Sequence, residues 1–279
     1  MTALRKRNVG KYALHAVLLM IGAMWVYPFV WMIFSSLKTN TEYVSSGIAL
    51  LPEQFRWENY VRAWEVANFS TYFQNSVIVT VSAVVIVVVL CALTGYALGR
   101  VNFPGKKLFI VAVTATMFIP KGYTIIPVYQ IIKELGLLNT LPGVILAESS
   151  GAHVLFILMF MSYFSGLPKE LEEASEMDGC GFIRTFVSVM LPISKPIVAT
   201  TAIMQFIWSW NSFFVPLIMT LNKPELRTLS VGMYSFVGEN SVDFTGMAAA
   251  ASISLVPIII IFIAFQRYFV EGIAGSVKG

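Results

Sequence analysis

The chain has 279 residues, of which 57% are hydrophobic and only 12% are charged, with a mean hydropathy of +0.75 and a net charge of +4. This composition is too apolar for a water-soluble domain, so it excludes a soluble enzyme and places the chain in a lipid bilayer. The basic residues are scattered between apolar stretches, which argues against nucleic acid as a partner. Cys91 and Cys180 lie in an apolar run and a polar loop, and imply no disulfide framework.

Six stretches are long and apolar enough to form membrane-spanning helices, which need about 20 such residues. They are 12–34, 73–98, 107–126, 143–164, 193–219 and 247–269. Pro120, Lys121 and Gly122 interrupt the third stretch, which predicts that its helix ends early and passes into a half-buried segment at 125–135. The fold class predicted from these stretches is an all-α, polytopic membrane protein with about six transmembrane helices.

The first stretch follows a basic cluster, Arg5, Lys6, Arg7 and Lys11. It is longer than a signal-peptide core of about 7 to 15 residues and lacks an obvious small-residue cleavage site, so we expect a retained helix. With the N-terminus inside, 12 of the 19 Lys and Arg residues fall on the cytoplasmic side and 7 on the other. This bias predicts that both termini are cytoplasmic.

The two connections on the outer side, at 37–71 and 220–246, are longer than hairpin loops and mix aromatic residues, prolines and charges of both signs. Such loops either dock a soluble partner or only cover the helix bundle. Trp57, Tyr60 and Trp64 resemble the aromatic anchors of protein interfaces, which favours docking.

The inner connection at 165–194 has the most regular pattern. After Pro168, a run of acidic residues at 169–177 predicts a short helix with acids near its positive end, and Gly179 and Gly181 are expected to stop it. An amphipathic run at 182–190 then leads into the fifth stretch. Two short helices joined by a glycine turn predict a knob that a cytoplasmic partner grips; the alternative is an ordinary solvated acidic loop.

The same segment resembles the EAA loop of binding-protein-dependent ABC importer permeases, in which Glu-Ala-Ala is followed after three residues by Gly and after nine more by Ile-x-Leu-Pro. Here the corresponding residues are Glu173, Ala174, Ser175, Gly179, Val189, Leu191 and Pro192. Ser175 replaces Ala and Val189 replaces Ile. A serine hydroxyl at a close helix contact needs a hydrogen-bond partner.

Further segments are similar to the carbohydrate branch of this family, specifically the smaller membrane subunit of maltose-type sugar importers, so that the resemblance covers nearly the whole chain. They are LPEQFRWENYVRAW with NSVIV, GYALGR with FPGKK, GLLNT, WNSFFVPL and the C-terminal QRYFVEGIAGSVKG.

The resemblance implies a type I ABC importer permease fold in a bacterial cytoplasmic (inner) membrane, crossed several times. It implies a sugar or oligosaccharide importer of five chains: this subunit, a related second permease, two ATP-hydrolysing subunits and an extracytoplasmic solute-binding protein. The sequence has no G-x-x-x-x-G-K-[ST] phosphate loop, so the chain is not expected to be an enzyme or to bind a cofactor, and ATP and Mg belong to the partner ATPase subunits.

In this organisation residues 1–11 are a cytoplasmic N-terminus, 12–34 the first transmembrane helix and 35–71 an extracytoplasmic loop. Residues 72–270 form the transmembrane core with five helices, including the cytoplasmic EAA coupling loop at 165–194. Residues 271–279 form a cytoplasmic tail.

The resemblance also implies roles for particular residues. The expected ATPase-coupling residues are Glu170, Glu173, Ala174, Ser175, Asp178, Gly179, Leu191 and Pro192. The expected ATPase-contacting residues of the tail, whose alternative is a frayed chain end, are Gly275, Ser276, Lys278 and Gly279.

The substrate path is expected near the middle of the bilayer, where polar side chains are costly and tend to be functional. The candidates are Asn75, Gln205, Ser209 and Asn211. For each of them, a hydrogen bond between helices is an equal alternative to sugar contact. Trp208 and Trp210 either stack on a sugar ring, face lipid or pack within the protein.

Two other function classes stay open at this point. An ion-coupled secondary transporter needs ionisable residues inside its spans, and Glu148 and His153 lie in the fourth stretch. Ser149 and His153, four apart on one predicted helix, superficially resemble a hydrolase dyad, but lack an orienting third group and an oxyanion site. With His15 and His153 the only histidines, no metal site is expected.

Overall fold

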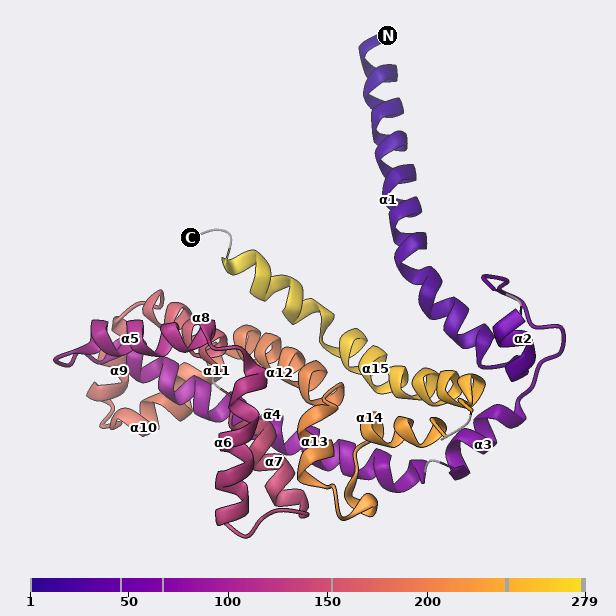
Figure 1. Cartoon of the computed structure of the whole chain (residues 1–279). Coiled ribbons are helices and arrows are strands. Elements are labelled where there is room, and N and C mark those ends of the chain that lie inside the picture. The colour runs from indigo at the N-terminus through magenta and orange to yellow at the C-terminus, as the bar shows by residue number, and fades with distance from the viewer. Residues whose placement is uncertain (1, 46, 67, 152, 239–240, 277–279) are drawn as a thin grey trace. The chain divides into compact units, whose positions relative to one another are not determined.

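The computed structural model describes residues 2–276 except 46, 67, 152 and 239–240, and does not describe the side chains of 2–10, 66, 121 and 267–276 (Figure 1). Regular structure in this part of the chain is helical, apart from one isolated antiparallel bridge between Val237 and Val242. The chain divides into two compact units, 1–69 with 233–256 and 70–232 with 257–279.

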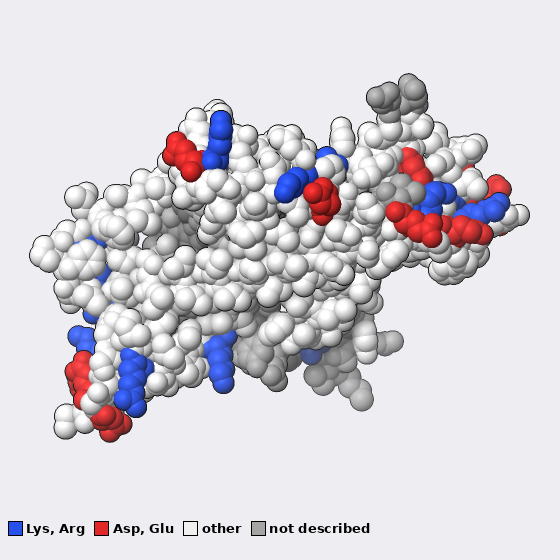
Figure 2. All heavy atoms as spheres, turned by 90° about the horizontal axis from the view of Figure 1, so that it is seen from below, with Lys and Arg blue, Asp and Glu red and all other residues white. Residues whose placement is uncertain are grey.

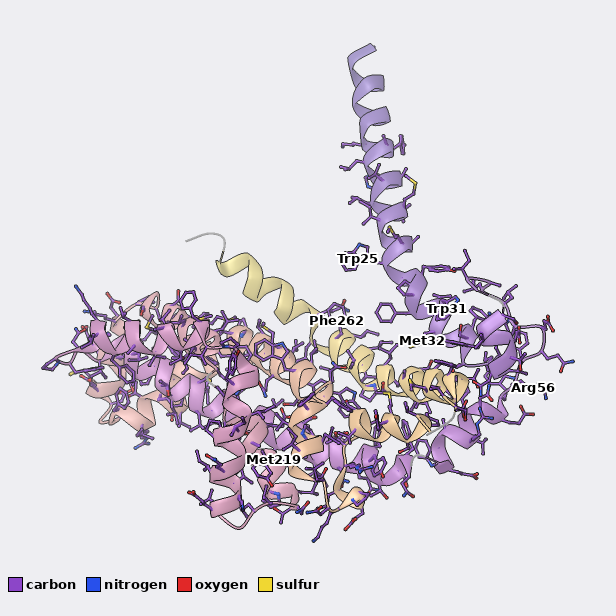
Figure 3. All side chains as sticks on the ribbon, in the orientation of Figure 1. Trp25, Trp31, Met32, Arg56, Met219 and Phe262 are labelled. Atoms are coloured by element: carbon purple, nitrogen blue, oxygen red, sulfur yellow. The ribbon has the colours of Figure 1, made fainter. Side chains whose placement is uncertain are left out.

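The first unit contains the long helix α1 and the outer connection that follows it. Its helices are α1 (Thr2–Ser35), α2 (Asn40–Ser45), α3 (Glu58–Val66), η4 (Met233–Phe236) and the first part of α15 (Phe244–Ser276). Residues 11–29 of α1 are all exposed, and Trp25, labelled in Figure 3, is 75% exposed. A helix that is apolar on all sides and exposed within its own unit is suited to lipid.

A polar network holds the outer connection of this unit together. The buried Lys38 donates from Nζ to the Ala49 carbonyl at 2.5 Å. Asn59 donates from Nδ2 to the carbonyls of Ser36 and Lys38, at 2.7 and 2.8 Å. Because buried polar groups must be paired, these bonds fix the path of a loop that contains little regular structure.

Asp243 organises the start of α15 within the same unit. Its carboxylate accepts from the Gly246 amide and from Asn40 Nδ2, and it forms a two-point ion pair with Arg62 of α3, with Nε to Oδ2 at 2.9 Å. Partial burial opposes its ionisation. The Gly246 amide, the Asn40 side chain and the Arg62 guanidinium outweigh this and hold the pKa of Asp243 below its ordinary value.

The second unit contains the remaining helices (Figure 1). In chain order they are α4 (Phe69–Arg100), α5 (Lys106–Ala115), η1 (Thr116–Phe118), α6 (Lys121–Glu134), α7 (Leu141–Ser149), α8 (Val154–Ser165), α9 (Glu170–Met177), α10 (Phe182–Thr185), the π-helical turn η2 (Phe186–Met190), α11 (Leu191–Ile193), α12 (Lys195–Trp210), α13 (Phe214–Met219), η3 (Pro224–Leu226) and α14 (Leu229–Gly232).

Three helices in the described chain are long and apolar enough to cross a membrane without interruption, and three bent helix pairs raise the number to six if each pair is one span. The uninterrupted helices are Lys11–Ser35, Phe69–Arg100 and Phe244–Gln266. The bent pairs are Lys106–Phe118 with Gly122–Glu134 at 106°, Leu141–Ser149 with Val154–Ser165 at 58°, and Phe182–Ile193 with Lys195–Trp210 at 81°. Figure 2 shows one face of the molecule, seen from below relative to Figure 1, on which charged side chains form a few separate groups.

The expected break of the third stretch is confirmed, but two predicted continuous helices are wrong. The helix predicted at 143–164 is broken between Ser149 and Val154, and the one predicted at 193–219 ends at Trp210 before α13 begins. Ser150 Oγ donates to the Ala147 carbonyl and Asn211 Nδ2 to the Ile207 carbonyl. Such side-chain bonds to the backbone compete with helical bonding where the apolar pattern is interrupted.

Helices α4 and α8 pack at close range through two glycines. A Cβ at Gly95 would lie 2.4 Å from Phe160 Cβ, and one at Gly99 would lie 3.1 Å from the Met161 carbonyl oxygen. Glycines four residues apart on a helix allow backbones to approach in this way in membrane bundles. Beside this contact, aromatic and aliphatic side chains of α4, α8, η2 and α12 form the main core of the unit.

Candidate coupling site

The connection before α12 folds into the predicted pair of short helices, and we call residues 169–194 the knob. Helix α9 begins with Glu170, Glu172 and Glu173 in its first turn, where the helix dipole favours negative charge. It ends at Met177, and Gly179, two residues later, has φ +75°. The Cys180 amide donates to the Ser175 carbonyl and the Gly179 amide to the Glu176 carbonyl, which is the Schellman arrangement. The stop expected at Gly179 is therefore observed.

Ser175 joins the two halves of the knob. Its side chain is buried, with Oγ 2.9 Å from Thr185 Oγ1 of α10. This is the hydrogen-bond partner that a serine at this position was expected to need. Because both hydroxyls are buried, the bond fixes α9 against α10.

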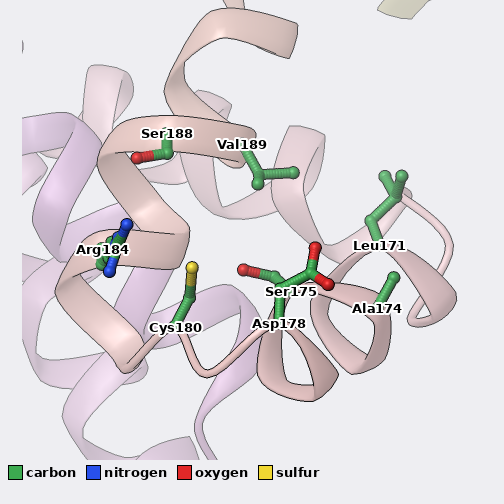
Figure 4. A pocket seen from close by; sticks show the side chains of 8 residues that line it. All are labelled: Leu171, Ala174, Ser175, Asp178, Cys180, Arg184, Ser188 and Val189. Carbon is green, nitrogen blue, oxygen red and sulfur yellow. The ribbon is translucent and has the colours of Figure 1, made fainter.

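The exposed face of α9, with the residue that follows the helix, carries the acidic members of the expected ATPase-coupling residues. Glu170, Glu173 and Asp178 are exposed, as are Ala174 and Gly179. Beside them lies a cavity of about 390 Å³, shown in Figure 4. It is lined by Leu171, Ala174, Ser175, Asp178, Cys180, Arg184, Ser188 and Val189. The knob thus presents an acidic rim and a shallow cavity on one side.

The opposite side of α9 is attached to the end of α4. Tyr96 Oη donates to Glu172 Oε1 at 2.8 Å, and Arg100 Nε lies 3.0 Å from Glu172 Oε2. The Nε–H is not aligned for a hydrogen bond, so the second contact is an ion pair. Arg100 also donates to the carbonyls of Leu167 and Pro168, at 3.0 and 2.9 Å, just before α9.

Leu191 and Pro192 lie apart from the outer face of the knob. They begin α11, where Leu191 is half-buried and Pro192 exposed. Directly after α11 the chain turns by 81° into α12. Their place in the structure is at the bend where the knob joins the next helix.

The tail residues are only partly described. Gly275 and Ser276 lie in the last turn of α15, and their side chains are outside the described part of the structure. Lys278 and Gly279 lie outside the described residues. The tail contact stays a prediction.

The predicted substrate-path residues make contacts within the protein. Asn75 Nδ2 donates to the carbonyls of Glu225 and Arg227, at 2.8 and 3.0 Å, and so fixes the connection before α14 to α4. Gln205 Nε2 donates to Ser209 Oγ at 2.9 Å, one turn along α12. Asn211 is exposed at the end of α12. The bonds of Asn75 are therefore of the structural kind, a hydrogen bond within the protein. Substrate contact stays a prediction for all four candidate residues.

The aromatic alternatives are also in contact with the protein. Trp210 is buried, 5.6 Å from the ring of Phe73 and 5.5 Å from that of Phe206. The ring of Trp208 stacks on Phe156 at 5.0 Å. Trp210 therefore packs inside the protein, whereas Trp208 packs on Phe156 and is 40% exposed, and contact of either ring with sugar stays a prediction.

The prediction that Ser149 and His153 lie on one helix, on which the hydrolase dyad depended, is wrong. Ser149 ends α7 and His153 precedes α8, so the two residues do not share a helix. Ser149 Oγ donates to the Ile145 carbonyl of its own helix. Within the described residues, no group of three or more His, Cys, Asp or Glu side chains is placed to hold a metal ion.

Residues 6–275 match the family model for the inner membrane component of binding-protein-dependent transport systems. The chain belongs to this family. As a permease, it is 36% identical over 266 residues to the diacetylchitobiose uptake system permease protein of Streptomyces coelicolor, an alignment that covers 95% of this chain and 86% of the relative. It is 31% identical over 254 residues to the melibiose/raffinose/stachyose import permease protein of Bacillus subtilis, with 90% and 91% covered.

The fold of the permease is shared with a solved structure. The crystal structure of a bacterial ABC transporter involved in the import of the acidic polysaccharide alginate matches with a TM-score of 0.80 and 24% identity, over 95% of this chain and 98% of that one. The permease is thus an all-helical, multi-pass inner-membrane protein with the ABC importer permease fold, and a transport subunit, not an enzyme.

Sequence reasoning did not single out Glu172, Tyr96 and Arg100, the residues that attach α9 to α4 in the permease. The signal was present, because Tyr96 and Arg100 stand in the GYALGR segment at the end of an apolar span. A charged residue at such a span end either reaches water or pairs with a neighbouring acid. The spacing along the chain does not identify which acid of α9 pairs with it.

Proposed function

We propose that the permease forms half of the sugar translocation path of an ATP-driven importer and is coupled to its ATPase through the knob. A related permease would form the other half, two ATP-hydrolysing subunits with their ATP and Mg would bind on the cytoplasmic side, and a solute-binding protein would dock outside. The observation that carries the proposal is the division of α9 into two faces. One face is exposed and acidic, and the other is fixed to α4.

The exposed face has the form of a docking surface. Glu173 projects from it without contributing to the internal contacts of Glu172 and Ser175, and the small Ala174 beside it leaves room for a partner. A basic side chain of the ATPase that pairs with Glu173 would lose its water on binding. Truncating one member of such a desolvated pair costs about 2 to 5 kcal/mol.

The sugar assignment rests on relatives that align over nearly the full chain. Their names specify diacetylchitobiose for one and melibiose, raffinose and stachyose for another. Both groups are short oligosaccharides. We therefore assign the substrate class of this permease as oligosaccharides of two to a few units.

The coupling proposal is tested by reversing the charge of Glu173. In the assembled transporter, Glu173→Lys is expected to abolish oligosaccharide uptake and retention of the ATPase subunits, while the permease still inserts in the membrane. Glu134→Lys, an equivalent change at an exposed position of α6, is the matched control and should leave both unchanged. Normal uptake by the Glu173 variant would refute the coupling role.

The substrate class is tested separately with the solute-binding protein of the proposed importer. Calorimetric titration with disaccharides and trisaccharides should give saturable binding, and the loaded protein should stimulate ATP hydrolysis by the reconstituted transporter. Parallel titrations with amino acids and inorganic ions should show no binding. Binding of these compounds without binding of sugars would refute the sugar assignment.

A further inference from the structure

The outer face of the knob explains how a partner is held, but not how its movement reaches the membrane helices. The backbone route runs through the π-helical turn η2 and then through the 81° bend into α12. A second route crosses from α9 to α4 through side chains. Glu172 is its centre, because both of its carboxylate oxygens contact residues of α4.

The contacts on this second route are largely enclosed. The side chain of Arg100 is 8% exposed and that of Glu172 is 20% exposed. Ion pairs and hydrogen bonds shielded from water are stronger than surface ones. The guanidinium of Arg100 also holds the carbonyls of Leu167 and Pro168, so it fixes both the carboxylate and the backbone that leads into α9.

Tyr96 connects α4 to both helices of the knob. Its hydroxyl donates to Glu172 of α9, while its ring stacks on Phe182 of α10 at 4.7 Å and lies 5.2 Å from the ring of Phe186 in η2. The hydroxyl and the ring therefore act on different segments. Removing the hydroxyl alone would leave the aromatic packing in place.

The helix that receives these contacts is itself fixed to α8. Gly99, directly before Arg100, and Gly95, one turn earlier, bring the two backbones together. Ser165 Oγ of α8, which donates to the Met161 carbonyl of its own helix at 2.7 Å, lies 3.4 Å from the Gly99 carbonyl oxygen. A force applied to Arg100 would thus move two helices together. Tightly packed elements of this kind move as rigid bodies.

We propose that Glu172 is a positioning residue that, with Arg100 and Tyr96, clamps α9 to the α4–α8 pair and passes the movement of the ATPase to the spans. This rests on the proposed coupling function of the knob. Glu173 and Glu172, neighbours on one helix, then have separate roles. Glu173 binds the ATPase, and Glu172 transmits the movement of α9 to α4.

The test compares variants of the complete transporter in proteoliposomes, with oligosaccharide uptake and ATP hydrolysis measured on the same preparation. Glu172→Ala should retain the ATPase subunits and basal hydrolysis, whereas uptake per ATP should fall at least about fivefold, the lower end of common coupling effects. Tyr96→Phe should lower the same ratio by a smaller factor. Glu134→Ala, which removes an exposed acid of α6 outside the knob, is the control and should leave the ratio unchanged.

Arg100→Ala adds a test of the shared pathway. If Glu172 and Arg100 act as one clamp, the double variant should be no worse than the more impaired single variant, because the second change removes a contact that is already lost. Multiplying losses would show independent roles and overturn the proposal. If Glu172→Ala does not assemble with the ATPase subunits, the proposal is tested with Tyr96→Phe and Glu172→Gln, which keep the packing. Uptake per ATP is again the quantity compared.

Two further outcomes separate this inference from the proposed function. An unchanged ratio for the Glu172 variants, or loss of the ATPase subunits from the conservative Glu172→Gln variant, would refute transmission through Glu172 while leaving the docking role of Glu173 intact. Normal uptake by Glu173→Lys in the same assay would instead remove the coupling function on which the clamp depends.

Discussion

Asp243 shows how a single carboxylate can organise an otherwise irregular loop. It caps the first turn of α15 through the Gly246 amide and pairs with Arg62 of α3, while Asn40 at the start of α2 donates to the same group. Three segments of one unit therefore meet at one side chain. The charge of Asp243 is stabilised in the folded state, which makes the stability of this unit depend on pH.

The sign of that dependence follows from the lowered pKa. A group that ionises more readily when folded contributes stability above its unfolded pKa, about 3.9 for Asp, and this contribution is lost as the pH falls through the folded value. At pH 7, Asp243→Asn should lower the unfolding temperature by roughly 2 to 4 °C, or about 1 kcal/mol. The difference from the parent chain should shrink as the pH falls below about 4.

Thermal unfolding of the detergent-solubilised permease at several pH values measures this effect. Glu65→Gln, at an exposed position of α3 in the same unit, is the control and should change the unfolding temperature little at any pH. A difference between Asp243→Asn and the parent chain that grows on acidification would contradict the assigned role.

At the residue scale, the sequence could identify the knob but not the direction in which its side chains point. Gly179 was expected to stop α9 because glycine tolerates a positive φ, and it does. Four acids lie within α9, and local spacing cannot tell which one faces the bundle. Glu172 is selected by Tyr96 and Arg100, more than seventy positions away in the chain, and only the fold brings them together.

Among the elements, the contact between α4 and α8 depends on the absence of side chains at two positions. At Gly95, a methyl group would lie 2.4 Å from Phe160 Cβ, so one of the helices would have to move. Overpacking of this kind usually costs about 1 to 3 kcal/mol. Because the proposed clamp uses the same helix, a displaced α4 would also weaken coupling.

Gly95→Ala should therefore lower both the unfolding temperature and the uptake per ATP of the reconstituted transporter. Gly22→Ala is the matched control, since a Cβ at Gly22 of α1 would meet nothing within 4 Å. It should leave both quantities unchanged. Equal behaviour of the two variants would show that the close approach of α4 and α8 is not needed.

The breaks in the helices were only partly predictable. Pro120 and Gly122 mark the first break in the sequence, since both disfavour a continuous helix. The breaks before Val154 and after Trp210 lie inside stretches whose average hydropathy is high, and averaging conceals a few polar residues. Ser212 Oγ donates to a carboxylate oxygen of Glu148 at 2.5 Å, so the ends of two broken helices stabilise one another through a contact that no local pattern contains.

For the whole molecule, composition and the EAA pattern were sufficient to predict the membrane location, the helical fold class and the family, because each is a property of the entire chain. The orientation of the permease follows from the charge bias of its loops and stays a prediction. Cys180 offers a direct measurement, since it lines the cavity of the knob and is half-buried, whereas Cys91 is only 3% exposed within α4.

In a Cys91→Ala background, a membrane-impermeant maleimide should label Cys180 in inside-out vesicles and not in intact spheroplasts. Gln54→Cys, introduced at an exposed position of the first outer loop, should show the opposite pattern. Labelling of Cys180 from the outside of spheroplasts would reverse the assigned topology and exclude the knob as a cytoplasmic docking site.

The bare surface of α1 has a consequence for biogenesis. Within its own unit, residues 11–29 stay exposed although the Tyr27 hydroxyl donates to the Ile48 carbonyl, so this helix depends on few contacts with that unit to settle in the bilayer. Helix α4 must instead wait for α8, which is translated later, before its glycines find their neighbour.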